Sequence, residues 1–176
     1  AFFQAIVGGV RQGGDGLVLD MRNNPGGFLE VSVNLAGWFV NRGDVVVSEK
    51  FTGGDEKVFR AYGNEALKNF PVVVIMNEGS ASASEILAGA LRVHNGTKIV
   101  GAKSFGKGTV QQLIDLSDGS TLKVTISHWL LPDGHLIEGN GLEPDYKVLV
   151  TDEDLISGRD PQLAKAIEVI KQEIRK

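Results

Sequence analysis

The sequence predicts a layered α/β domain built on a mostly parallel β-sheet with flanking helices. Three observations lead to this prediction. Short apolar segments alternate with segments whose apolar residues recur at helical spacing. The run at 71–76 is β-branched and uniformly apolar, which is typical of a strand buried on both faces. Glycines cluster between these segments, where they favour turns. We expect a single domain over residues 1–176.

Composition restricts the function classes. The chain has 176 residues, of which 42% are hydrophobic and 23% charged, and these ordinary values exclude a disordered or collagen-like chain. The net charge of −4 disfavours nucleic acid as a partner. Cysteine is absent and only three histidines are present, which excludes a thiolate nucleophile and disfavours a metal cluster. We therefore expect no metal and no cofactor.

The first half of the chain predicts helices and strands in alternation. Apolar residues at helical spacing indicate helices, and short apolar runs closed by a turn indicate strands. The polar stretch at 50–62 indicates a hairpin or an exposed excursion of the chain. The expected elements are a helix at 2–10, a strand at 16–20, a helix at 29–40, a strand at 45–47 and the hairpin at 50–62.

The second half predicts the centre of the sheet and the end of the chain. The strand at 71–76 is expected to be central, and the Ala-rich segment after it has one apolar stripe, typical of a helix. Asp160 and Pro161 suit the N-cap and first position of a last helix. The expected elements are strands at 71–76, 97–100, 110–116 and 121–129, a helix at 82–91 and a final helix that opens at 160–161.

Three turns follow expected parallel strands, at 20–27, 77–84 and 101–108. The carboxyl ends of parallel strands are the usual place for a site in such folds. In the first turn, Gly26 and Gly27 can expose backbone N–H groups, although a plain turn held by asparagine side chains explains them equally. Asp20 and Arg22 in the same turn are expected to pair.

The second turn has two interpretations. Serine at the start of a helix lies near unpaired N–H groups that could hold an oxyanion, which suits a nucleophile. Alternatively, Ser82 and Glu85 have the spacing of a capping box. An α/β-hydrolase elbow is not supported, because the Gly-x-Ser-x-Gly pattern is absent.

The third turn resembles a phosphate-binding loop only in part. Gly108 stands where Ser or Thr would meet Mg²⁺, and the residues after it favour a strand over a helix. Nucleotide binding is therefore a disfavoured alternative. Lys107 is either an exposed turn lysine or a base whose pKa is lowered by partial desolvation.

Taken together, these turns match a longer ordered pattern that covers essentially the whole chain. The pattern resembles the carboxyl-terminal processing proteases, also called tail-specific proteases, of peptidase family S41. The matching stretches are 16–27, 79–91, 100–101, 105–111, 132–134, 141–145 and 160–163.

The resemblance implies a serine endopeptidase with a Ser–Lys dyad, in which Ser82 is the nucleophile and Lys107 the base. It also implies that Gln111 orients the lysine and that the backbone N–H groups of Gly27 and Ala83 form the oxyanion hole. The implied fold is a crotonase/ClpP-like core with C-terminal β segments and a final helix. A free lysine with a pKa of ~10.4 is mostly protonated at neutral pH, so this mechanism predicts activity that rises with pH.

The same resemblance implies partners and a location. Family members usually carry a PDZ domain ahead of the protease core, and we expect a PDZ domain or adaptor in the full-length protein. Polypeptide substrates bound through their C-termini are expected, and a homo-oligomer is possible within this family. The implied location is extracytoplasmic, in a bacterial periplasm or cell envelope or a thylakoid lumen. The alternative function is a catalytically silent module of the same fold that binds peptides or apolar ligands.

Overall fold

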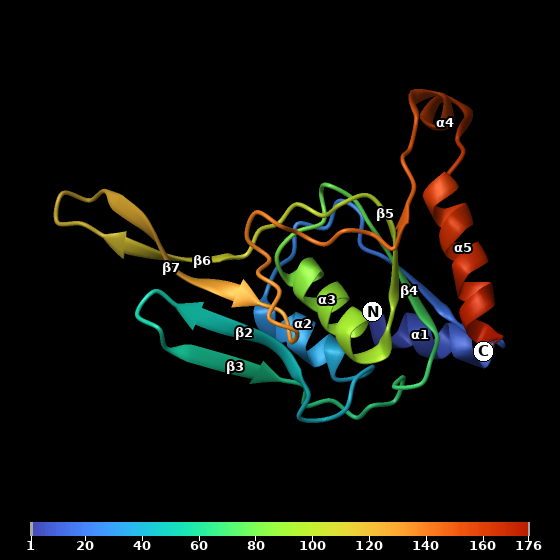
Figure 1. The fold of residues 1–176 in the computed structure, drawn as a ribbon, viewed down its shortest axis with the longest axis horizontal. Coiled ribbons are helices and arrows are strands. Elements are labelled where there is room, and N and C mark those ends of the chain that lie inside the picture. Colours follow the sequence, from blue (N-terminus) through green and yellow to red (C-terminus); the bar gives the residue numbers. More distant parts are fainter. Residues whose placement is uncertain (1, 176) are drawn as a thin grey trace.

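The computed structural model describes residues 2–175 and contains two four-stranded sheets (Figure 1). The parallel sheet has the order β1 (Leu17–Asp20), β4 (Val72–Met76), β5 (Lys98–Gly101) and β8 (Tyr146–Lys147). The antiparallel sheet has the order β3 (Glu56–Arg60), β2 (Val45–Phe51), β7 (Thr121–Leu130) and β6 (Thr109–Asp115). The predicted parallel sheet and its central strand are confirmed. The predicted hairpin also forms, but it pairs with the later β segments in a second sheet that the sequence did not predict.

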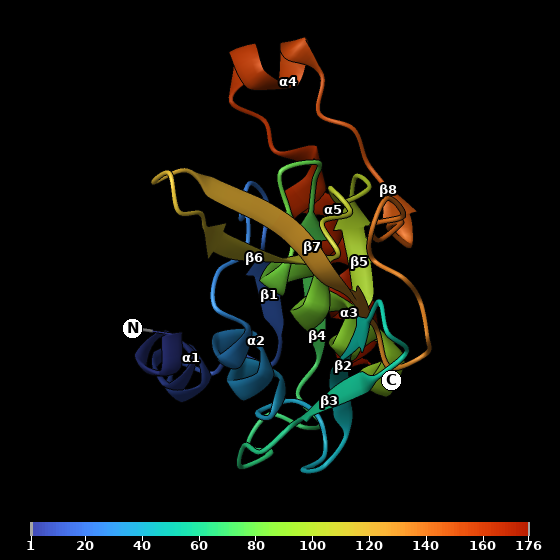
Figure 2. The ribbon, with the colours of Figure 1, turned by 90° about the vertical axis from the view of Figure 1, so that its left-hand side faces the viewer.

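The helices are α1 (Phe2–Arg11), α2 (Leu29–Ala36), α3 (Ala83–Asn95), α4 (Asp152–Ser157) and α5 (Pro161–Ile174). Helices α3 and α5 pack on opposite faces of the parallel sheet, whereas α4 projects away from it (Figure 2). Side chains alternate along β4, so Val73 and Ile75 pack with Val169 of α5, while Val74 and Met76 join a core shared with α3. Burial of each side chain of this kind stabilises the fold by about 1.5–3 kcal/mol. Because both faces of β4 are buried, all of its residues are apolar.

Helix α2 ends at Ala36, earlier than the predicted end at residue 40. Gly37 lies directly against Gly63, and a Cβ atom at Gly37 would clash with the Gly63 backbone nitrogen. Phe39 and Val40 are nevertheless buried, so their apolar character extended the predicted helix beyond its end.

Two further elements, β8 and α4, were not predicted. Helix α4 has a sequence signal that could have found it, since Thr151 and Asp154 form a capping box.

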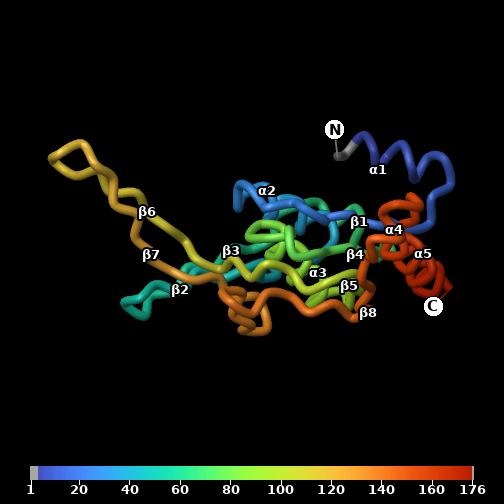
Figure 3. Tube along the Cα trace, turned by 90° about the horizontal axis from the view of Figure 1, so that it is seen from above, coloured from blue at the N-terminus to red at the C-terminus, as the bar shows by residue number. Residues whose placement is uncertain are grey.

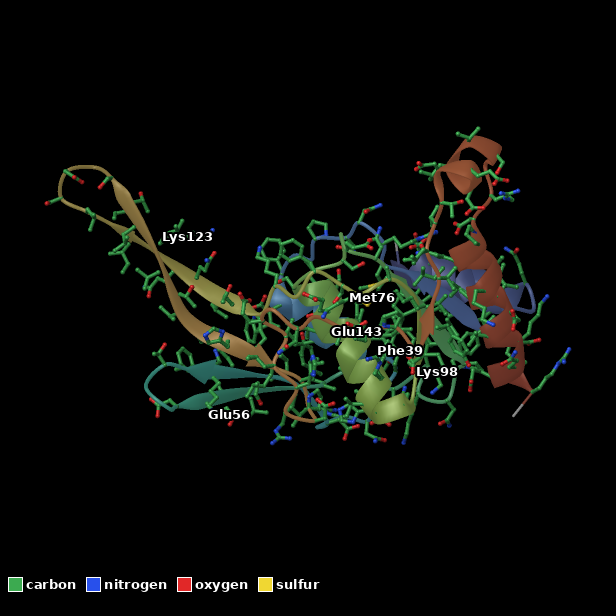
Figure 4. All side chains as sticks on the ribbon, turned by 45° about the horizontal axis from the view of Figure 1, so that its top comes forward. Phe39, Glu56, Met76, Lys98, Lys123 and Glu143 are labelled. Atoms are coloured by element: carbon green, nitrogen blue, oxygen red, sulfur yellow. The ribbon has the colours of Figure 1, made fainter. Side chains whose placement is uncertain are left out.

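Two hairpins extend from the body of the molecule. The β6–β7 hairpin reaches furthest (Figures 1 and 3). In Figure 4, Lys123 lies on that hairpin and Glu56 on the β2–β3 hairpin, while Met76 lies in the body. Strands β1, β4 and β5 run parallel, so their carboxyl ends share one edge of the sheet, and the three turns of interest all begin there.

Candidate active site

Hydrogen bonds between backbones join the three turns. The Ala81 nitrogen donates to the Asn24 carbonyl at 3.0 Å, which connects the second turn to the first. The Phe105 nitrogen donates to the Ser80 carbonyl at 2.9 Å, which connects the third turn to the second. The three turns therefore lie together at one edge of the sheet, and the turn at 77–84 is the middle of the three.

The three serines of the middle turn have different roles. Ser80 is fully buried and its hydroxyl donates to the Met21 carbonyl at 2.8 Å. Ser84 is 2% exposed and its hydroxyl donates to the Asn24 carbonyl at 3.1 Å. Ser82 lies between them and is partly exposed. Ser82 is thus the member of this trio whose side chain a substrate can reach.

Ser82 has a strained backbone. Its φ of 56° and ψ of −119° lie in a region that residues other than glycine rarely occupy, at a cost of about 1–3 kcal/mol. It is the N-cap residue of α3, so its side chain lies at the positive end of the helix dipole. Ser82 is the last residue of the loop that connects β4, which ends at Met76, to α3, which begins at Ala83.

Glu85 connects the second and third turns. Its carboxylate is fully buried, and Oε2 accepts hydrogen bonds from the backbone nitrogens of Ser82, at 2.7 Å, and Lys107, at 2.9 Å. Oε1 accepts from the Gly106 nitrogen at 2.7 Å and from the Ser104 hydroxyl at 2.5 Å. The predicted capping interaction of Ser82 and Glu85 is present. The other three hydrogen bonds to this carboxylate were not predicted from the sequence.

Lys107 and Gln111 are both exposed. Lys107 lies in the third turn and Gln111 on the edge strand β6, where it is opposite Thr125. Within residues 2–175, no hydrogen bond joins the Lys107 amine or the Gln111 amide to Ser82. The structure therefore connects the backbones of Ser82 and Lys107 through Glu85, but no hydrogen bond joins their side chains.

Gly26 lies directly on the Ser82 turn. Its φ is +95°, and an added Cβ would be 2.7 Å from the Ala81 carbonyl oxygen and 2.8 Å from the Ala83 nitrogen. This contact places Gly27 beside Ala83. Neither the Gly27 nor the Ala83 nitrogen donates a hydrogen bond to another described residue, so both N–H groups are available to an incoming oxygen.

An open pocket of about 360 Å³ adjoins these N–H groups. Gly27 and Ala83 are part of its wall, and its apolar side comes from helices α2 and α3, through Val31, Leu35 and Leu87. A small or medium apolar side chain suits this pocket.

Arg22 binds the first turn to the start of α5. Its guanidinium contacts Asp20 at 2.6 Å and Asp160 at 2.8 Å, and it also donates to Gln162 at 3.2 Å. Burial raises the pKa of Asp20, but hydrogen bonds from Arg22 outweigh this effect and hold that pKa below its usual value. Hydrogen bonding to Arg22 likewise lowers the pKa of Asp160.

The Arg22 cluster predicts a pH-dependent stability. A carboxyl whose pKa is lower in the folded state stabilises the protein above its unfolded pKa, near 3.8, and this stabilisation is lost as the pH falls through the lowered value. We expect Arg22→Met to decrease the free energy of unfolding by about 1 kcal/mol at pH 7, and by less at pH 3. Urea unfolding at both pH values measures the difference. An equal loss at both would contradict the prediction. The control is Arg159→Met, since Arg159 follows α4 and pairs on the surface with Glu153 and Asp154.

Other classes of site find less support. Strand β6 begins at Thr109, directly after the Gly101–Gly108 loop, so no helix N-terminus follows that could hold a phosphate, as a nucleotide-binding loop requires. Within residues 2–175, no cluster of three histidine or acidic side chains has the geometry to hold a metal ion. None of the helices in this part of the chain has the length and apolarity to cross a membrane.

A hydrolase that uses a serine nucleophile needs an accessible serine, N–H donors for an oxyanion and a base, and the three turns bring residues of these types together. The sequence model of peptidase family S41 matches residues 1–148. The chain belongs to this family.

Relatives with curated names and solved structures are consistent with this assignment. The chain is 41% identical over 179 residues to a protein of Staphylococcus haemolyticus named "Probable CtpA-like serine protease", covering 94% of this chain and 36% of that protein. It is 42% identical to the structure of a photosystem II D1 C-terminal processing protease, with a TM-score of 0.76, covering 82% of this chain and 37% of the other. The structure of mature CPAF, at 16% identity and a TM-score of 0.76, covers 92% of this chain and 44% of the other, and it shares the fold. The chain spans about a third of the length of the first two relatives.

Proposed function

We propose that this chain is the catalytic core of a serine endopeptidase that cleaves polypeptides near their C-termini with a Ser–Lys dyad. One observation carries the proposal. Ser82 is the accessible serine of its turn and has a strained backbone at a helix N-terminus, and its backbone shares the acceptor atom Glu85 Oε2 with the backbone of Lys107.

The proposed reaction has two halves. The neutral amine of Lys107 removes the hydroxyl proton of Ser82 while Oγ attacks the scissile carbonyl carbon. The N–H groups of Gly27 and Ala83 stabilise the resulting oxyanion, an effect worth about 3–4 kcal/mol per donor in other enzymes. The C–N bond then breaks and Lys107 passes the proton to the leaving amine. A water molecule attacks the acyl-enzyme, with the same lysine as its base, and frees Ser82.

The proposed dyad needs one rearrangement. The Lys107 side chain is exposed, and its flexible four-carbon stem must turn toward Ser82 before it can accept a proton. The backbone of the lysine turn is held by Glu85, and the proposed rearrangement is a change in the side-chain rotamers of Lys107. Gln111, two residues into β6, is proposed to orient the amine once it has turned.

The pocket beside Gly27 and Ala83 indicates which substrates fit. Its apolar side favours a small or medium apolar residue immediately before the cut. By analogy with its relatives, we propose C-terminal segments of polypeptides as substrates, a PDZ domain or adaptor as the device that captures them, and an extracytoplasmic location. A homo-oligomer belongs to the same set of proposals.

A cleavage assay tests the function. The chain is incubated between pH 6 and pH 10 with an unstructured protein that has an apolar C-terminus, and products are identified by mass spectrometry. We expect cuts close to the C-terminus and a rate that rises with pH, because a lysine base must be neutral. Binding of the same protein without any cut over the whole pH range would contradict the proposal. It would favour the second candidate, a silent binding module, which the apolar pocket also suits.

A further inference from the structure

Glu85 is a buried titratable group that the proposed reaction does not use. It lies on α3, one turn after Ser82, and its side chain is fully shielded from solvent. A buried carboxylate is costly unless hydrogen bonds satisfy it. Four donors surround this one at 2.5–2.9 Å, and they come from three separate places: the start of α3, the backbone of the lysine turn and the Ser104 side chain.

The two carboxylate oxygens have different roles. Oε2 accepts from the backbone nitrogens of Ser82 and Lys107, the two proposed catalytic residues. Oε1 accepts from Gly106 and Ser104. Hydrogen bonds to an ionised acceptor are shorter and stronger than neutral ones. Because both nitrogens donate to Oε2, this atom fixes the position of the Ser82 backbone relative to the Lys107 backbone. This shared acceptor therefore sets the backbone separation that the Lys107 side chain must span to reach Ser82.

We propose that Glu85 is a positioning residue for catalysis, whose carboxylate holds Ser82 and Lys107 in register without touching the substrate. This inference rests on the proposed function. An error of about 1 Å in the placement of reacting groups can reduce a rate about 10²-fold. Loss of the shared acceptor is therefore expected to slow the chemical step rather than to weaken substrate binding.

Ser104 offers a matched control within the same network. It is 5% exposed, it donates to Oε1, and its oxygen accepts from the Leu142 nitrogen at 2.7 Å. Ser104→Ala removes a buried polar group and two hydrogen bonds, but it leaves both bonds to Oε2 in place. A purely structural role for the network would make this variant and a Glu85 variant behave alike.

The experiment compares Glu85→Gln with Ser104→Ala, Ser82→Ala and the wild type in the cleavage assay, with folding checked by circular dichroism and thermal unfolding. Glutamine has the size of glutamate but only one acceptor oxygen, so one of the two pairs of donors, to Oε1 or to Oε2, loses its partner. We expect kcat of folded Glu85→Gln to fall at least about 30-fold, with KM within about 3-fold of the wild type. We expect Ser104→Ala to unfold at a lower temperature while its kcat stays within about 3-fold of the wild type.

Each outcome has a distinct meaning. Unchanged kcat in Glu85→Gln, or an equal loss of kcat in Ser104→Ala, would overturn the positioning role and leave the dyad intact. Full activity in Ser82→Ala would instead overturn the proposed function. If Glu85→Gln does not fold, Glu85→Asp decides, because it keeps the charge but shortens the side chain by one carbon. A fall in kcat at constant KM supports the proposal, and a wild-type kcat contradicts it.

Discussion

Replacing Ser82 by alanine is expected to reduce kcat/KM for peptide cleavage by about 10³-fold or more, and replacing Lys107 by alanine is expected to do the same. Removal of the hydroxyl removes the atom that forms the acyl-enzyme. Removal of the amine leaves the hydroxyl without a base, and an unassisted serine is a weak nucleophile at neutral pH. The two losses should not add in the double variant, because the residues act as a unit.

A second lysine and a second serine serve as matched controls. Lys103 lies in the same turn as Lys107 and pairs with Glu143 at 3.1 Å on the surface. Ser117 is exposed at the end of the β6–β7 hairpin. Lys103→Ala and Ser117→Ala are expected to keep wild-type kcat/KM. Cleavage by Ser82→Ala at the wild-type rate would refute the dyad, and a loss confined to Lys107→Ala would point to a different nucleophile.

The sequence predicted the parts of this fold that are determined locally. The β-branched run of β4 has apolar side chains on both faces, and these faces meet α3 and α5. Asp160 caps α5 by accepting from the Leu163 nitrogen at 2.9 Å, as its position before proline indicated. The gathering of the three turns followed from strand direction alone, since parallel strands end at one edge.

Contacts between residues that are distant in sequence were not predictable in this way. The residues around Gly37 do not indicate that the Gly63 backbone lies against the Gly37 backbone, directly after the end of α2. The antiparallel sheet depends on β2 pairing with β7, more than seventy residues later. For Glu85, the spacing from Ser82 revealed one hydrogen bond, while the three to the turn at 104–107 required the folded chain.

In the candidate site, the choice of Ser82 is supported by the structure, whereas the roles of the other residues are not tested by it. The spacing to the lysine in family members singled out Ser82, and burial of Ser80 and Ser84 now supports that choice on independent grounds. The roles of Lys107, Gln111, Gly27 and Ala83 stay predictions that only kinetics can test. The exposed lysine side chain could not be predicted from the motif, because rotamers of surface residues depend on solvent and on substrate.

Gly26→Ala is expected to impair both stability and catalysis. The methyl group would meet the backbone of Ala81 and Ala83 at less than 3 Å, and these atoms cannot yield as a flexible side chain would. The positive φ adds strain of about 1–3 kcal/mol for a residue with a Cβ. Since Gly27 follows directly, relief of the clash must displace one proposed oxyanion donor from the other. Loss of one such donor costs about 10²–10³-fold in kcat in other enzymes.

Gly43→Ala separates the two effects. Gly43 also has a positive φ, of 92°, but an added Cβ there has no heavy atom within 4 Å, and the residue lies outside the site. It should therefore show the backbone strain, measured as a lower free energy of unfolding, with unchanged kcat. If Gly26→Ala loses only as much stability as Gly43→Ala and cleaves at the wild-type rate, then the close packing of the first turn on the Ser82 turn does not align an oxyanion hole. A kcat loss in Gly26→Ala alone would show that the contact positions the donors, because the strain common to both variants cannot account for it.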